Sequence, residues 1–97
     1  MRIISRKTLK EFWEIHPDCI EPLRTWYRET SKAQWKGPAE IRGQYASVSL
    51  LKNNRAVFDI KGNHYRIVVR INYEFGIVWI RFVGTHADYD RIDANNI

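Results

Sequence analysis

The sequence is poor in cysteine and contains no long hydrophobic run. Cys19 is the only cysteine among 97 residues, so an internal disulfide is impossible and a reducing, cytoplasmic setting is expected. No apolar run approaches the roughly 20 residues that a membrane helix needs. The first residues, MRIISRKTLKEFW, also lack the apolar centre of a signal peptide. These absences favour a soluble cytoplasmic protein without a membrane partner.

Several sequence patterns that carry chemistry are missing as well. The chain has no glycine-rich phosphate loop and no nucleophile elbow. No grouping of histidine and cysteine suits zinc, and the carboxylates of Asp88, Asp90 and Asp93 lack the glycine turn and the distal glutamate of a calcium loop. The sequence therefore predicts neither a metal ion nor a cofactor.

Composition indicates one folded domain that has a basic surface. Hydrophobic residues at 44% and aromatic residues at 13% exceed what a disordered chain carries. The length fits a single domain over residues 1–97, and no repeat, linker or low-complexity tract divides it. Sixteen Lys and Arg against eleven Asp and Glu give a net charge of +5, which favours an acidic partner such as nucleic acid. Charge alone decides little, because many small soluble proteins are equally basic.

Two amphipathic helices are predicted in the first third of the chain. Ser5 is a candidate cap for a helix over Arg6–His16. Asp18 and Glu21 have the spacing of a capping box that would begin a second helix over Cys19–Gln34. The apolar residues recur at helical spacing and predict one buried stripe on each helix. These stripes consist of Leu9, Phe12, Trp13 and His16, then Cys19, Leu23, Trp26, Tyr27 and Thr30.

The remainder of the chain alternates like strands between short turns. Strands are predicted over Arg2–Ser5, Ala46–Leu51, Arg55–Ile60, His64–Tyr73 and Ile77–Val83. Trp35–Tyr45 reads as a loop with one helical turn at Ala39–Arg42, and Asp88–Ile92 as a last helical turn. The expected fold is α+β in the order β-α-α-β-β-β: an antiparallel sheet with two N-terminal helices on one face and a short C-terminal helical turn.

Strand alternation is expected to gather cations on the face of the sheet opposite the helices. Successive side chains of a strand point to opposite faces. The apolar residues expected on the helix side are Tyr65, Ile67, Val69, Ile71, Val78, Ile80 and Phe82. The residues expected on the open side are Lys61, Arg66, Arg70, Trp79 and Arg81. Guanidinium groups beside an aromatic ring fit single-stranded nucleic acid, whereas the alternative is an ordinary solvated sheet face.

A histidine and a tyrosine follow the last predicted strand. His86 and Tyr89 are three residues apart, about one helical turn, so both are expected at the rim of the basic face. A histidine exchanges protons near neutral pH and would supply general acid or base chemistry beside a phosphodiester. The arginines would then stabilise the charge of the transition state. The alternative is structural: His86 caps a helix and Tyr89 fills the edge of the core.

The run KGNHYRIVVRINYEFGIVWIRFVGTHADYDRID (Lys61–Asp93) resembles the HigB toxins of bacterial toxin–antitoxin modules. The stretches IISRKTLKEFWEIHPD and WYRETSKAQWKGPAEI resemble them too, so the likeness covers nearly the whole chain. It implies a RelE-like fold and an endoribonuclease that cleaves mRNA without a metal ion, on the ribosome, so that translation is inhibited. It also implies a HigA-type helix-turn-helix antitoxin as partner, through which alone operator DNA would be bound.

The resemblance also implies roles for individual residues. The family pattern G-N-x-Y-R is met at Gly62, Asn63, Tyr65 and Arg66, and G-T-H-x-x-Y-D at Gly84, Thr85, His86, Tyr89 and Asp90. The implied catalytic residues are Arg66, His86, Tyr89, Lys61 and Arg81. The residues expected to bind RNA are Lys36, Arg42, Asn63, His64, Arg70 and Trp79. Two other readings stay open: a non-catalytic RNA- or ribosome-binding module, and a protein-interaction domain that holds an acidic partner strand.

Overall fold

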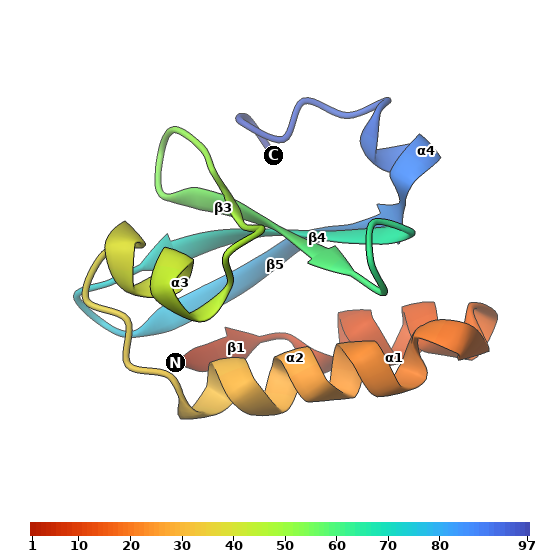
Figure 1. Ribbon diagram of the computed structural model, residues 1–97, viewed down its shortest axis with the longest axis horizontal. Coiled ribbons are helices and arrows are strands. Elements are labelled where there is room, and N and C mark those ends of the chain that lie inside the picture. Colours follow the sequence, from red (N-terminus) through yellow and green to blue (C-terminus); the bar gives the residue numbers. More distant parts are fainter.

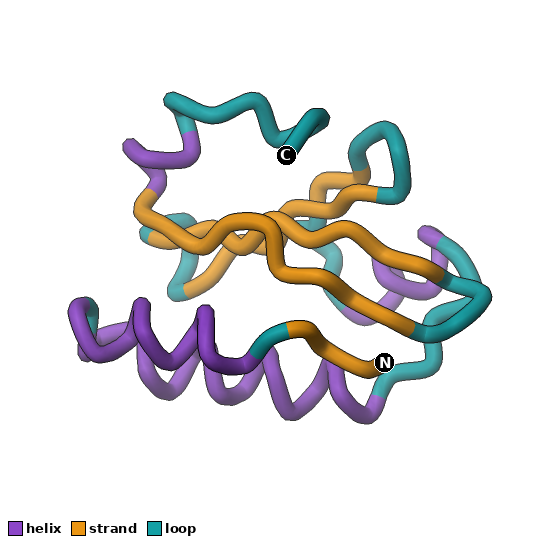
Figure 2. Tube along the Cα trace, turned by 180° about the vertical axis from the view of Figure 1, so that it is seen from behind, coloured by secondary structure: helices purple, strands orange, loops and turns teal.

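The computed structural model describes all 97 residues as a helical layer, a five-stranded sheet and a C-terminal segment on the other side of the sheet (Figure 1, Figure 2). The elements are β1 (Arg2–Ile4), α1 (Arg6–Ile15), the 3-10 helix η1 (Pro17–Cys19), α2 (Ile20–Lys32), α3 (Pro38–Gln44), β2 (Ser49–Leu50), β3 (Arg55–Ile60), β4 (Tyr65–Asn72), β5 (Ile77–Thr85) and α4 (His86–Tyr89). The expected α+β order is confirmed. No helix is both long enough and apolar enough to cross a membrane.

The sheet has the strand order β1-β5-β4-β3-β2. Strands β2 to β5 pair antiparallel as expected, whereas β1 pairs with β5 in parallel and makes the sheet mixed. Tight turns precede β3 and β4: Asn53 and Asn54 adopt φ of 58° and 59° before β3, and Gly62 adopts 69° before β4. Asparagine and glycine tolerate this left-handed region best, so the turns lie where the sequence predicts them. Strand β2 has only two residues, so most of the strand predicted over Ala46–Leu51 does not form.

The two long helices begin within one residue of their predicted starts, but neither uses its predicted cap. The Ser5 side chain makes no capping hydrogen bond to α1. The capping box of Asp18 and Glu21 does not form, because Pro17–Cys19 make a 3-10 turn and the Asp18 carboxylate binds Lys61 and Tyr65 instead. The predicted single turn at Ala39–Arg42 is the longer helix α3, and the last helix begins earlier than predicted, at His86.

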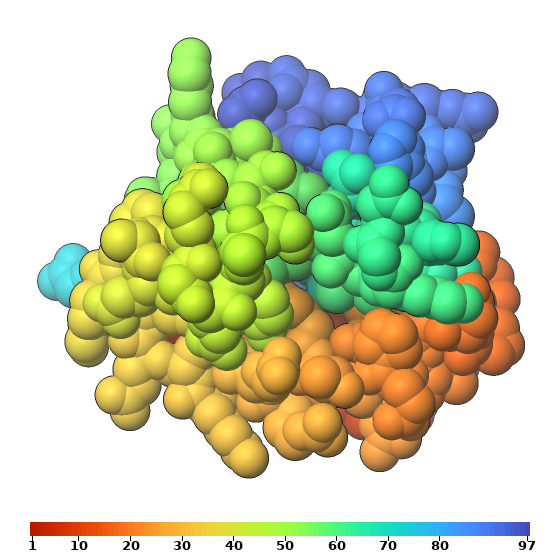
Figure 3. Space-filling model, viewed as in Figure 1, coloured from red at the N-terminus to blue at the C-terminus, as the bar shows by residue number.

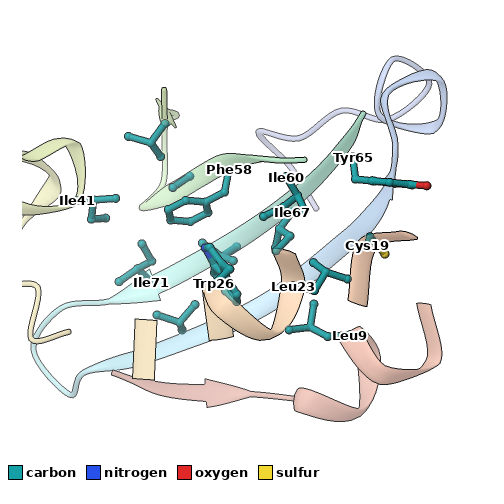
Figure 4. Packing of buried hydrophobic residues seen from close by; sticks show 14 of the residues in the cluster. Leu9, Cys19, Leu23, Trp26, Ile41, Phe58, Ile60, Tyr65, Ile67 and Ile71 are labelled. Carbon is teal, nitrogen blue, oxygen red and sulfur yellow. The ribbon is translucent and has the colours of Figure 1, made fainter. Parts of the chain in front are cut away.

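The main hydrophobic core lies between the helices and the sheet. The predicted stripes are confirmed: Leu9 and Trp13 of α1 are buried, and so are Cys19 and the inner residues of α2. Figure 4 shows Leu23 and Trp26 pointing toward the strands that carry Phe58, Ile67 and Ile71. His16 stacks on the ring of Phe12 at 4.4 Å, so it packs at the core edge as the first helix pattern predicts.

A bulge in β5 changes the expected alternation. Val69 lies opposite Ile80 and Val68 lies opposite Phe82, so Arg81 is the extra residue without a partner on β4. One extra residue reverses which side chains face which side of the sheet. The prediction that Phe82 joins the main core is therefore wrong: Phe82 packs in a second cluster, and Val83 packs against the main core.

Candidate functional site

The face of the sheet opposite α1 and α2, named the outer face here, is partly covered. Residues 86–97 run across it, as Figure 2 shows. Val57, Val68 and Ala94 are buried there, and the side chains packed against them are Leu51, Phe82, Tyr89, Ile92 and Ile97. The expectation that this face is open is thus wrong at its centre, since the C-terminal segment supplies the apolar contacts that Val57 and Val68 need. The cations remain at the two ends of the face.

Arg66 occupies the end of the outer face near α4. Its Nε lies 2.8 Å from Oδ1 of Asp59, the residue beside it on β3, and its side chain is only 16% exposed. Its guanidinium carbon lies 5.0 Å from the centre of the Tyr89 ring, within cation–π range. A carboxylate and an aromatic ring therefore fix one arginine at the place where β4 meets the C-terminal segment.

His86 is held in place by the turn that ends β5. Thr85 and Asp88 form a capping box, with Asp88 N donating to Thr85 Oγ1 at 3.1 Å and Thr85 N donating to Asp88 Oδ2 at 3.3 Å. The His86 backbone N–H donates to the carbonyl of His64 in the β3–β4 turn at 3.1 Å. These bonds orient a four-residue helix that propensity alone would not stabilise.

Asp90 completes a pair with His86. Oδ2 of Asp90 lies 3.1 Å from Nδ1 of His86, and the imidazole is 47% exposed. With Nδ1 facing a carboxylate, Nε2 is the nitrogen left for a substrate. Asp90 is not among the predicted site residues, although its place four residues after His86 in the pattern G-T-H-x-x-Y-D was a usable signal.

Lys61 does not join this group. Its backbone takes φ of 54°, and its Nζ lies 2.9 Å from Oδ2 of Asp18, on the helical side of the sheet. The Tyr65 hydroxyl donates to the other oxygen of the same carboxylate at 2.7 Å. Figure 3 shows the β3–β4 turn lying between the η1 region and the blue C-terminal residues. The expectation that Lys61 shares the outer face with Arg66 is therefore wrong.

The contacts around Asp18 shift two ionisation equilibria. Hydrogen bonds from Lys61 and then from Tyr65 lower the pKa of the Asp18 carboxyl, because they stabilise its charged form. The same hydrogen bond to Asp18 is the main cause that raises the pKa of Tyr65 to about 12. Burial raises the pKa of the nearby Cys19 thiol to about 11, which makes this thiol a poor nucleophile near neutral pH.

Arg70 and Trp79 form a second group at the other end of the outer face. The Arg70 guanidinium carbon lies 5.9 Å from the Trp79 ring centre, and the two residues are opposite each other on β4 and β5. They line a hollow of about 350 Å³ together with Asn54, Asn72 and Glu74. Arg70 is four residues from Arg66, or about 13 Å along an extended strand. This second group therefore cannot contact the same phosphate as Arg66.

The remaining predicted residues are dispersed. Asn63 and His64 are exposed in the β3–β4 turn beside His86, whereas Arg81 is exposed at the bulge. Lys36 and Arg42 lie near and on α3, at the opposite side of the molecule from α4 in Figure 1. The structure thus places Arg66 against Tyr89, which shares the short helix α4 with His86, and puts Asn63 and His64 in the adjacent turn. It leaves Lys36, Arg42, Lys61 and the Arg70–Trp79 pair elsewhere.

The architecture and these motifs place the chain in the RelE-like class of toxins. Residues 19–92 match the family described as HigB_toxin, the RelE-like toxic component of a toxin–antitoxin system. This match covers most of the chain, which therefore belongs to the HigB toxin family.

Curated relatives extend over almost the full length. The "mRNA interferase HigB" of Escherichia coli O6:H1 is 27% identical over 94 residues, covering 95% of this chain and 91% of the relative. The "mRNA interferase toxin HigB" of Escherichia coli strain K12 is 29% identical over 96 residues, covering 97% and 92%. The chain and these relatives are thus similar from end to end.

Proposed function

We propose that this toxin is an mRNA endoribonuclease whose reaction takes place between Arg66 and His86. The observation that carries this proposal is the arrangement at α4: Arg66 is ion-paired with Asp59, Tyr89 of α4 lies against its guanidinium, and His86 of the same helix is paired with Asp90. The relatives that are named mRNA interferases support the choice of RNA as substrate. An arginine and a histidine in this arrangement fit cleavage of a phosphodiester, a reaction that needs both stabilisation of negative charge and proton transfer.

The proposed reaction uses the ribose 2′-OH as nucleophile. Its oxygen attacks the adjacent phosphorus, the bond to the 5′-oxygen of the next nucleotide breaks, and the products are a 2′,3′-cyclic phosphate and a 5′-OH. Nε2 of His86 moves a proton to or from the reacting oxygens, while Asp90 holds the imidazole ring through Nδ1. Arg66 stabilises the negative charge on the phosphoryl oxygens, and Tyr89 orients Arg66 or the phosphate. No step requires a metal ion.

The substrate in this proposal is single-stranded mRNA presented in the ribosomal decoding site. Asn63 and His64 lie beside His86 in a turn and can contact the same strand. Arg70 and Trp79 would hold a more distant nucleotide through phosphate contact and base stacking. The partner in this proposal is a HigA-type helix-turn-helix antitoxin, and operator DNA would be bound only through that complex.

A cleavage assay that reads product ends tests the proposal. Purified protein is incubated with a labelled mRNA in a magnesium buffer that keeps ribosomes assembled, with and without ribosomes. The expected result is cleavage that requires ribosomes and leaves a 2′,3′-cyclic phosphate that acid converts to a monophosphate. Products that carry a 5′-phosphate would contradict the mechanism, because attack by the ribose 2′-OH leaves a 5′-OH. RNA binding without any cleavage would favour the non-catalytic binding module.

A further inference from the structure

A pocket lined by arginines lies in the helical layer, far from the outer face. It has a volume of about 170 Å³, and its five lining residues are Arg6, Trp13, Arg24, Tyr27 and Arg28. All five belong to α1 or α2, which cover the opposite face of the sheet from α4 (Figure 2). The pocket is therefore separate from the Arg66–His86 group, with the sheet between them.

The charge of this pocket is uncompensated. No carboxylate lines it, and neither Arg6 nor Arg28 has an ion-pair partner within 4 Å. Only Arg24 has one, Glu21 at 3.6 Å, and that contact is solvent-exposed and weak. Arg24 and Arg28 are also four residues apart on α2, a spacing at which like charges destabilise a helix. An anion bound between the three guanidiniums would relieve this repulsion.

Both aromatic residues of the pocket contact the guanidinium of Arg6. The Arg6 guanidinium carbon lies 5.2 Å from the Trp13 ring centre and 5.9 Å from that of Tyr27. Trp13 is itself buried in the main core. A nucleobase would need an exposed ring face, so base stacking is disfavoured here. Guanidinium groups match the geometry of phosphate oxygens, so the pocket fits a phosphate group and no particular base.

We propose that the Arg6–Arg24–Arg28 pocket binds a backbone phosphate in the duplex stem of a folded RNA. This inference rests on the proposed function, which makes RNA the ligand of the protein. A strand at His86 has to pass around the sheet to reach the pocket, and the molecule measures 22 Å even along its shortest axis. The phosphate therefore belongs to a second element of a large folded RNA. Contact with phosphate alone makes this binding independent of sequence and sensitive to salt.

The test measures binding of a labelled RNA hairpin by fluorescence anisotropy over a series of KCl concentrations. The double variant Arg6→Gln/Arg28→Gln is compared with the charge-matched control Lys10→Gln/Lys52→Gln, whose residues are exposed and lie outside the pocket. We expect the pocket variant to bind about tenfold more weakly, with a salt slope that is smaller by about 1. The control should bind the hairpin nearly as well as the wild type. Binding of a short single-stranded RNA, which has no duplex stem to reach the pocket, should be the same in all three proteins.

Equal weakening in the control variant would overturn the proposal, because general charge would then explain the binding. Pocket-dependent binding of a polyglutamate peptide in place of the hairpin would also overturn it and indicate an acidic protein partner. Thermal melts show whether each variant is folded. The single variant Arg28→Gln repeats the test while keeping the Arg6 contacts to Trp13 and Tyr27, in case the double variant is destabilised. The hairpin assay measures binding and needs no cleavage. If the wild type bound the hairpin through the pocket but cleaved no RNA, the proposed nuclease function would be refuted while the phosphate-binding role of the pocket would stand.

Discussion

Each end of the outer face carries an arginine against an aromatic ring, but the surroundings of the two arginines differ. At the α4 end, Arg66 lies against Tyr89 and is ion-paired with Asp59. At the other end, Arg70 lies against Trp79 and forms no ion pair. Only the α4 end also has histidines, His86 and His64, and of these two His86 is paired with a carboxylate, that of Asp90. An arginine next to an aromatic ring is enough for binding, whereas chemistry also needs a fixed arginine and a group that transfers protons.

The largest expected effect separates the two histidines of the α4 end. His86→Ala should lower single-turnover cleavage by about 10²–10⁴-fold, because the proton-transfer group is lost. His64→Ala should keep most of the rate, since its imidazole has no fixed partner and its carbonyl still accepts from His86 N–H. Quench-flow kinetics with labelled mRNA on ribosomes measure both. Equal loss in the two variants would contradict the assignment of His86.

The next comparison sets the two arginines against each other. Arg66→Lys should lower the cleavage rate by about 10²-fold, because lysine keeps the charge but loses the planar fork that stabilises a phosphoryl transition state. Arg70→Lys should change the rate little, since a charge near a distant phosphate suffices there. The same assay at saturating protein separates rate from affinity. If Arg70→Lys lowered the cleavage rate more than Arg66→Lys, the active site would lie at the Arg70–Trp79 end of the outer face instead.

Two glycines provide a stability test of the α4 end. A Cβ at Gly84, which lies opposite Arg66, would approach Phe82 Cζ to 2.5 Å and Asp88 Cβ to 3.2 Å. Gly84→Ala should therefore lower the free energy of unfolding by about 1–3 kcal/mol. Gly43→Ala meets no atom within 4 Å in helix α3 and should raise it by about 0.5–1 kcal/mol. Urea unfolding followed by tryptophan fluorescence measures both changes. If Gly84→Ala leaves the free energy of unfolding unchanged, Phe82 and Asp88 can move to make room for the added Cβ at little cost.

The smallest expected effect concerns the contacts of Asp18 with the β3–β4 turn. The pKa of Asp18 is lowered in the folded state, so its stabilisation is present above the unfolded carboxyl value of about 3.9 and is lost as pH falls through the folded value. Asp18→Asn should accordingly lower the melting temperature at pH 7, with a difference that shrinks below pH 4. Thermal denaturation followed by circular dichroism at both pH values checks the sign. A difference that grows in acid would contradict the assigned contacts.

Local pattern predicted much of the fold, and its failures have physical causes. The buried stripes of both long helices and the inner row of β4 follow from periodicity that involves near neighbours only. Phe82 was assigned to the wrong side because a bulge depends on how β5 pairs with β4. The predicted side for Lys61 is wrong because strand alternation predicts neither its left-handed backbone nor its ion pair with Asp18, which is 43 positions away.

The candidate site divides in the same way. The amino-acid sequence alone predicts two features of the site, because each depends on backbone geometry over a few residues. One is the spacing of His86 and Tyr89, and the other is the placement of Arg66 and Arg70 on one side of β4. Only the tertiary structure decided that residues 86–97 cover the middle of the outer face and that Asp59 and Tyr89 fix Arg66. Contacts of this kind join segments that are distant along the chain, and burial of apolar surface across the whole fold determines which of them form.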